Sequence, residues 1–252
     1  MEMRMKRIRK ETGEKTGYFS DPVGLLFPRR CPVCQEAVEE KGARICDICR
    51  TRLPYIRGPV CMRCGKPLFS EEREYCGDCS RKRRWTDRGR APFLYDEVMR
   101  RSIAGYKYGG RREYAAFYAE EILRRCAGEI KGWGAEVFVP IPLHASRKRK
   151  RGFNQAELLA EGLSKRSGIP TDAGLLKRVK KTHVQKELND QERLTNLKDA
   201  FSVRKGKVPY QNIILVDDIY TTGSTVDTAA KVLKEHGAQK VYSVCICVGN
   251  GN

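Results

Sequence analysis

The sequence predicts an α/β protein in which a doubly wound, mostly parallel sheet follows a small cysteine-rich module. Three observations predict this architecture. Strand and helix patterns alternate from about residue 136 onward, as in folds built on a parallel sheet. The apolar run at 213–216 leads through an acidic, hydroxyl-rich segment into a helix pattern at 226–236. Four Cys-x-x-Cys pairs occupy the chain between residues 31 and 79.

Composition narrows the class of partner and the compartment. The chain has 252 residues, enough for one sizeable domain and a smaller module, and its net charge of +19 favours a polyanionic partner, either nucleic acid or an anionic membrane surface. Residues 1–20 lack apolar periodicity and predict a mobile basic tail, with a short amphipathic anchor as the alternative. Because no signal peptide or membrane-spanning run is readable, we expect a cytoplasmic protein with no integral membrane association.

The cysteine pairs have the spacing of a tandem zinc ribbon at residues 21–84. In each half, eleven residues separate the two pairs. One Cys-x-x-Cys turn aims two thiolates at a tetrahedral ion, and a second turn completes a four-sulfur site. We expect two structural Zn²⁺ sites with sequential quartets, although interleaved ligands also fit the spacing, and we expect metal binding to drive folding. The predicted ligands are Cys31, Cys34, Cys46, Cys49, Cys61, Cys64, Cys76 and Cys79.

Residues 85–252 predict the main domain. Its expected strands are apolar runs at 91–95, 137–144, 175–179, 201–203, 213–216 and 240–248. Its expected helices, with apolar residues spaced for one buried side, lie at 98–106, 114–126, 158–163, 191–199 and 226–236. Asp96 is expected to cap the first of these helices, and Gly237 to close the last. Cys126, Cys245 and Cys247 lack partners at metal spacing and are expected to be buried.

The segment after the run at 213–216 predicts a sugar-phosphate site. A strand, a tight turn and a helix bring backbone N–H groups and hydroxyls to one phosphate, while adjacent carboxylates require a ligand that also carries hydroxyls. A ribose 5-phosphate meets both demands, whereas an ordinary strand with an acidic turn is the plainer alternative. The segment resembles the phosphoribosyl pyrophosphate (PRPP) motif of type I phosphoribosyltransferases. The expected PRPP-binding residues are Asp217, Asp218, Thr221, Thr222, Gly223, Ser224 and Thr225.

Basic clusters predict a nucleic-acid surface. Arg147–Arg151 follows the strand at 137–144, and loops at the carboxyl ends of parallel strands converge on the ligand crevice. We therefore expect these cations beside the phosphate turn, with a solvated loop as the alternative. Aromatic platforms between cations suit single strands of any sequence, and Trp85, Tyr106, Tyr108 and Phe153 are the candidates. The candidate nucleic-acid contacts are Arg83, Arg84, Lys107, Arg111, Lys148, Arg149, Lys150, Arg151, Lys180 and Lys181.

From Phe27 to the C-terminus the chain resembles the ComF family of competence proteins. The resemblance rests on the paired cysteine motifs and on the segments Val139–His144, Arg151–Ala160, Glu192–Phe201 and Val216–Gly223. It implies a type I phosphoribosyltransferase-like fold, PRPP binding and a role in natural transformation, with single-stranded DNA and the competence DNA translocase as partners and recruitment by a partner to the inner face of the membrane. It also implies Mg²⁺ bridging the oxygens of pyrophosphate and ribose. The implied pyrophosphate loop is Leu143, His144, Ala145, Ser146 and Arg147.

Two hypotheses of function follow. In the first, the protein handles nucleic acid and retains a PRPP site. In the second, it is an active type I phosphoribosyltransferase of nucleobase salvage, which would stabilise an oxocarbenium-like state and departing pyrophosphate. No base-recognition motif is readable after Ile246, and no general acid or base stands out, although His144 merits a test. The sequence therefore leaves turnover open.

Overall fold

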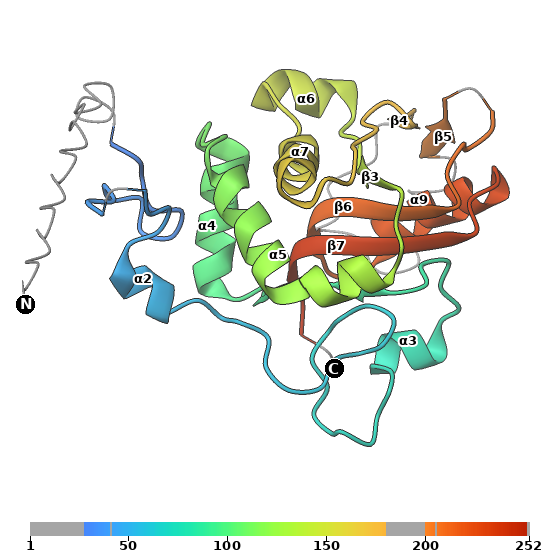
Figure 1. Ribbon diagram of the computed structural model, residues 1–252, viewed down its shortest axis with the longest axis horizontal. Coiled ribbons are helices and arrows are strands. Elements are labelled where there is room, and N and C mark those ends of the chain that lie inside the picture. The colour runs from blue at the N-terminus through green and yellow to red at the C-terminus, as the bar shows by residue number, and fades with distance from the viewer. Residues whose placement is uncertain (1–27, 41, 180–199, 205, 251–252) are drawn as a thin grey trace, which may run out of the picture.

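The computed structural model describes residues 28–40, 42–179, 200–204 and 206–250. Its centre is a parallel sheet in the order β1-β7-β6-β3, with β2 also paired to β7 (Figure 1). The strands of this sheet are β1 (Gly89–Arg90), β2 (Phe93–Leu94), β3 (Val137–Pro140), β6 (Asn212–Tyr220) and β7 (Lys240–Val248). The apolar run in β6 and its neighbours in β7 are buried because both faces of the sheet are covered.

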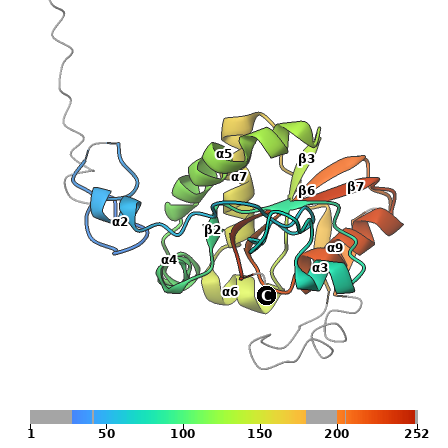
Figure 2. The same ribbon diagram turned by 90° about the horizontal axis from the view of Figure 1, so that it is seen from below.

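Helices cover both faces of the sheet (Figure 2). One face carries Phe138, Ile214 and Val244, which share an apolar cluster with α4, α5 and α7. The other carries Val139 and Leu215, which pack with α9. This arrangement confirms the predicted doubly wound class. The helices are α2 (Asp47–Thr51), α3 (Gly77–Arg81), α4 (Glu97–Tyr108), α5 (Tyr114–Gly132), α6 (Ala145–Arg151), α7 (Gln155–Ser167) and α9 (Ser224–Glu235).

Local signals set several boundaries as predicted. The Asp96 carboxylate accepts a hydrogen bond from Met99 N at 2.9 Å and so begins α4. Gly237, with φ of 115°, follows α9, and β7 has the predicted bounds. Of the expected strand at 91–95, only Phe93–Leu94 forms a strand, β2, and the short strand β1 precedes the predicted range; Pro92, which has no N–H to donate, lies between the two.

The strand β6 is longer than predicted. Its pairing with β7 continues through Ile219 and Tyr220, which lie opposite Cys247 and Val248. The two carboxylates expected after the strand are therefore inside it. Their backbone is fixed by the sheet, so their positions do not depend on a loop.

The basic run after β3 is a helix, α6, where a loop was expected. His144 accepts a hydrogen bond from Ser146 N at 3.3 Å and caps the helix, and Gly152, with φ of 76°, ends it. Asn154 then caps α7 by accepting from Ala156 N at 3.2 Å. The cations consequently project from a short rigid element that follows β3.

A two-stranded antiparallel ribbon stands apart from the main sheet. It consists of β4 (Leu176–Arg178) and β5 (Phe201–Val203). The alternation of strands and helices had suggested that both belong to the parallel sheet, and this expectation is wrong. The helix expected at 191–199 and the basic tail at 1–20 lie outside the described residues.

The two halves of the cysteine-rich module pack on different parts of the main domain (Figure 1). In the first half, the carbonyl of Cys31 accepts a hydrogen bond from the Tyr114 hydroxyl of α5 at 3.1 Å. In the second half, Cys64 shares an apolar cluster with Tyr220 of β6 and Leu233 of α9. The boundary at residue 84 stays a prediction. Within the described part of the chain, no helix is long and apolar enough to cross a membrane.

Candidate functional site

The carboxylates of Asp217 and Asp218 lie near the carboxyl end of β6. The backbone N–H of Asp218 donates a hydrogen bond to Asp217 Oδ1 at 2.8 Å, so the Asp217 carboxylate is held against the backbone of the next residue. Burial, and next the charge of Asp218, raise the pKa of Asp217 to about 7, although the hydrogen bond from Asp218 and the charges of Lys107 and Arg178 oppose the shift. Near neutral pH the Asp217 carboxyl is therefore close to the midpoint of its titration.

A lysine from the last turn of α4 forms an ion pair with Asp218. The Lys107 ammonium donates to Asp218 Oδ1 at 2.8 Å, and the two side chains are 16% and 15% exposed. Burial disfavours the charged form of this lysine, but the Asp218 carboxylate outweighs it and the pKa of Lys107 is raised. Lys107 was predicted as a nucleic-acid contact, and in the structure its ammonium contacts Asp218 of the predicted PRPP motif.

The turn between β6 and α9 is shaped by a close approach of its glycine to Tyr220. Gly223 has φ of 78°, and a Cβ at this position would overlap the buried Tyr220 hydroxyl. The hydroxyls of Thr222 and Ser224 share a hydrogen bond of 2.9 Å, and Ser224 begins α9. The turn thus presents hydroxyl groups and the start of a helix directly after the acid pair.

The segment predicted to face pyrophosphate follows β3, the strand that pairs with β6. Ile141 N donates to the carbonyl of Val216 at 2.9 Å, so the chain leaves β3 next to the residue that precedes the acid pair. Residues 143–147 therefore start from the carboxyl end of the sheet, where parallel-sheet ligands bind. Within that segment the Nδ1 atom of His144 and the Ser146 hydroxyl are 2.8 Å apart.

The charge of Arg178 acts on Asp217, and Arg147 lies close enough to act on Arg178 in turn. Burial lowers the pKa of Arg178 on β4, the Arg147 guanidinium lowers it further, and Asp217 opposes both effects. Arg147 was predicted as part of the pyrophosphate loop. From the later basic run, Lys180 and Lys181 were predicted as nucleic-acid contacts and Arg178 was not; Lys180 and Lys181 lie outside the described residues. An anion bound between Arg147 and Arg178 would relieve their mutual repulsion.

The remaining predicted nucleic-acid contacts divide by their surroundings. Lys148, Arg149 and Lys150 are exposed on α6, and Lys148 pairs with Glu157 at 3.1 Å. Arg151 donates to Gln155 Oε1 at 3.0 Å. Earlier in the chain, Arg111 lies 3.8 Å from Glu113, Arg83 lies over the Trp85 ring, and Arg84 Nε is buried. The exposed cations of the set are therefore concentrated on α6.

The four predicted aromatic platforms differ in exposure, and Tyr108 is the most exposed of the four. Its side chain is 70% exposed, whereas Tyr106 and Phe153 are buried and Trp85 is partly buried. The Arg151 guanidinium lies 4.9 Å from the centre of the Tyr108 ring, and Arg151 Nη2 donates to its hydroxyl at 3.1 Å. The ring is thus held in place beside the cations of α6.

The eight predicted ligands form two sequential quartets of sulfur. Within each quartet all the Sγ atoms lie within 4.8 Å of one another. The Sγ atoms of Cys34 and Cys46 are 3.9 Å apart, and those of Cys64 and Cys76 are 3.6 Å apart. A tetrahedral Zn²⁺ with Zn–S bonds of about 2.3 Å requires sulfurs about 3.8 Å apart, so both quartets fit the ion. Sequential pairing of the cysteines is confirmed, and interleaving is not observed.

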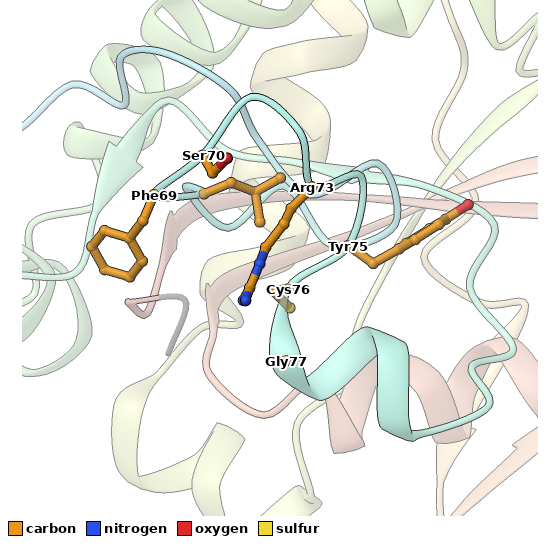
Figure 3. A pocket seen from close by; sticks show the side chains of 7 residues that line it. Phe69, Ser70, Arg73, Tyr75, Cys76 and Gly77 are labelled. Atoms are coloured by element: carbon orange, nitrogen blue, oxygen red, sulfur yellow. The ribbon is translucent and has the colours of Figure 1, made fainter.

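A cavity of about 270 Å³ lies on the second half of the cysteine-rich module (Figure 3). Phe69 and Tyr75 point to opposite sides there, and the Phe69 side chain is 91% exposed. The cavity is lined by Leu68, Phe69, Ser70, Arg73, Tyr75, Cys76 and Gly77. Because all its lining comes from this one half, it is separate from the acid pair and its turn.

Known proteins match both parts of the chain. Residues 23–80 match the double zinc ribbon domain family, and residues 146–252 match the phosphoribosyl transferase domain family. Competence protein F of Haemophilus influenzae is 31% identical over 226 residues, or 86% of this chain and 95% of that protein. DNA utilization protein YhgH of Salmonella typhimurium is 31% identical over 228 residues, or 88% and 98%. Competence protein ComFC of Bacillus subtilis is 30% identical over 200 residues, or 77% and 79%.

Proposed function

The chain belongs to the ComF family of competence proteins, and from this premise we propose that it binds PRPP and handles incoming single-stranded DNA in natural transformation. The proposal places it in the cytoplasm, with the competence DNA translocase as a partner. The names of its relatives, which include a DNA utilization protein, support a role with DNA.

PRPP binding is inferred above all from one arrangement, in which the acid pair and the turn lie at the carboxyl end of β6 and the predicted pyrophosphate segment follows the neighbouring strand β3. The carboxylates of Asp217 and Asp218 would accept hydrogen bonds from the ribose hydroxyls. The turn at 221–225 would receive the 5-phosphate, and residues 143–147 would face pyrophosphate, with Arg147 as the cation. Mg²⁺, when bound, would neutralise the charge between pyrophosphate and ribose oxygens, and it needs few protein ligands to do so.

Single-stranded DNA binding rests on the exposed cations of α6 and the ring of Tyr108. Lys148, Arg149 and Lys150 are available for phosphates, and Tyr108 offers a face on which a base can stack. Neither group reads base edges, so we expect binding without sequence preference. Affinity should fall steeply with salt, because each neutralised phosphate releases a counterion.

Ligand protection against urea tests the PRPP proposal. The zinc-loaded protein is unfolded with and without PRPP and Mg²⁺, in parallel with Asp217→Asn plus Asp218→Asn. A ligand at 100 times its Kd stabilises the folded state by about 2.7 kcal/mol. We expect this protection in the wild type and its loss in the double variant. Equal protection of both proteins would place PRPP elsewhere.

A fluorescence anisotropy titration tests the DNA proposal. Labelled single strands are titrated with protein from low to moderate salt. We expect a linear fall of the logarithm of affinity with the logarithm of salt concentration. Affinity that does not change with salt would exclude the cations of α6 as the binding surface.

An active phosphoribosyltransferase is the second candidate function, and the match of residues 146–252 to the phosphoribosyl transferase domain favours it. Incubation with PRPP, Mg²⁺ and a panel of nucleobases would reveal turnover as pyrophosphate release. Release with any base supports the enzyme. Tight PRPP binding without release supports a site that regulates or senses.

A further inference from the structure

The ion pair between Lys107 and Asp218 joins two parts of the chain that are 111 residues apart. Its 2.8 Å length and low exposure mean that few water molecules reach it. Removing one partner from such a pair leaves the other charge poorly solvated, which is costly. Asp218 is one of the two carboxylates proposed to accept the ribose hydroxyls. Lys107 therefore contacts a residue of the proposed ribose site.

The chain holds Lys107 in this position through the block Arg151–Gln155. Gln155 Nε2 donates to the carbonyl of Lys107 at 3.4 Å, and the Tyr106 hydroxyl donates to the carbonyl of Gln155 at 2.8 Å. The ring of Phe153 packs 6.1 Å from that of Tyr106. These contacts hold the last turn of α4 in place. The backbone of Lys107 is therefore fixed where its ammonium can reach Asp218.

The charges of the three groups nearly cancel. Asp218 pairs with the ammonium of Lys107, while burial and the charge of Asp218 favour a proton on Asp217 at neutral pH and below. One oxygen of Asp218 is occupied by Lys107, which leaves the second oxygen as an acceptor for a ligand. Asp217 offers one oxygen beyond the one that Asp218 N occupies.

We propose that Lys107 is a positioning residue of the sugar-phosphate site, which orients and neutralises Asp218 so that the acid pair accepts the hydroxyls of a phosphorylated pentose without a divalent cation. This inference rests on the proposed function and specifies its ligand class further. Mg²⁺ is then needed for the pyrophosphate of PRPP but not for the pentose. Ribose 5-phosphate, which lacks pyrophosphate, binds equally well with and without Mg²⁺.

Calorimetric titration of ribose 5-phosphate tests the proposal. The protein is kept zinc-loaded in magnesium-free buffer, since a chelator would strip the ribbons, and each titration is repeated with Mg²⁺. The variants are Lys107→Met, which removes the charge, and Lys107→Arg, which keeps it. Lys165→Met, at an exposed position on α7, is the matched control.

We expect the wild type and the control to bind ribose 5-phosphate with affinity that Mg²⁺ does not change. Lys107→Met weakens binding of ribose 5-phosphate about tenfold or more, because the charge-assisted contact of Lys107 with Asp218 is lost. Mg²⁺ partly restores the affinity of this variant. Lys107→Arg recovers most of the affinity. A merely structural role would lower affinity without creating this dependence on Mg²⁺, and thermal unfolding of each variant checks that the fold survives.

The contradicting results are distinct. Wild-type binding that requires Mg²⁺, or Lys107→Met binding as tightly as the wild type, overturns the inference and leaves PRPP binding intact. A wild type that binds neither ribose 5-phosphate nor PRPP overturns the proposed function and this inference together.

Discussion

Replacing Gly223 by alanine tests the shape of the phosphate turn. At φ of 78° an alanine costs about 1–2 kcal/mol in left-handed strain. Its Cβ would also overlap the hydroxyl and Cζ of Tyr220 and lie 2.9 Å from Cε2. That ring is buried at the junction of β6 and the second half of the cysteine-rich module, so it has little room to move. Overpacking of this kind costs about 1–3 kcal/mol, and the two terms together give about 2–5 kcal/mol.

Gly168 provides a matched control for this prediction. It has the same φ of 78°, but nothing lies within 4 Å of a Cβ placed there. Gly168→Ala should lose only the strain of about 1–2 kcal/mol. Urea unfolding at fixed zinc and reductant measures both variants, and adding Tyr220→Leu to Gly223→Ala should recover part of the loss. Equal losses for the two alanine variants would refute the packing argument. The stabilisation that PRPP gives against urea unfolding should be lost in Gly223→Ala and retained in Gly168→Ala.

Three further predictions concern metal, pH and DNA. Cys61→Ser should lower the melting temperature more than Cys34→Ser, because Cys61 is buried in a core cluster and Cys34 is exposed. Thermal unfolding, with the zinc content measured alongside, tests this prediction, and equal shifts in melting temperature would contradict it. The folded-state pKa of Asp217, raised from 3.8 to about 7, gives stability that is complete below 3.8 and lost as pH rises through about 7. The stability of Asp217→Asn should therefore rise relative to wild type as pH increases from 3.8 to about 7, and a constant difference in unfolding free energy over that range would disprove the shift. Tyr108→Ala should weaken single-stranded DNA binding by about 1–3 kcal/mol with an unchanged salt slope, while Phe69→Ala, at an exposed aromatic on the second half of the cysteine-rich module, should not; anisotropy titrations decide between them.

Features that depend on short stretches of sequence were predictable. The Cys-x-x-Cys spacing predicted two four-sulfur sites because both turns of each site lie close together in the chain. The alternation of strands and helices predicted the doubly wound sheet, and Asp96 and Gly237 predicted helix ends through local hydrogen bonding and backbone preference.

Features that depend on distant pairings were not predictable. No local signal connects Lys107 with Asp218, because their contact requires the last turn of α4 to lie near the carboxyl end of β6. The three-residue runs of β4 and β5 carry no information about the direction in which they pair. The helix α6 has almost no apolar residues and hence no readable periodicity, although Gly152 was an available signal for its end.

Direct calorimetric titration of PRPP with Mg²⁺ into the zinc-loaded protein tests the central claim, that Asp217 and Asp218 with the turn at 221–225 form a PRPP site. We predict saturable binding with one site per chain in the wild type. We predict no measurable binding in Asp217→Asn plus Asp218→Asn, with the zinc content and melting transition retained. Absence of binding in the wild type, or unchanged binding in the folded double variant, would contradict it.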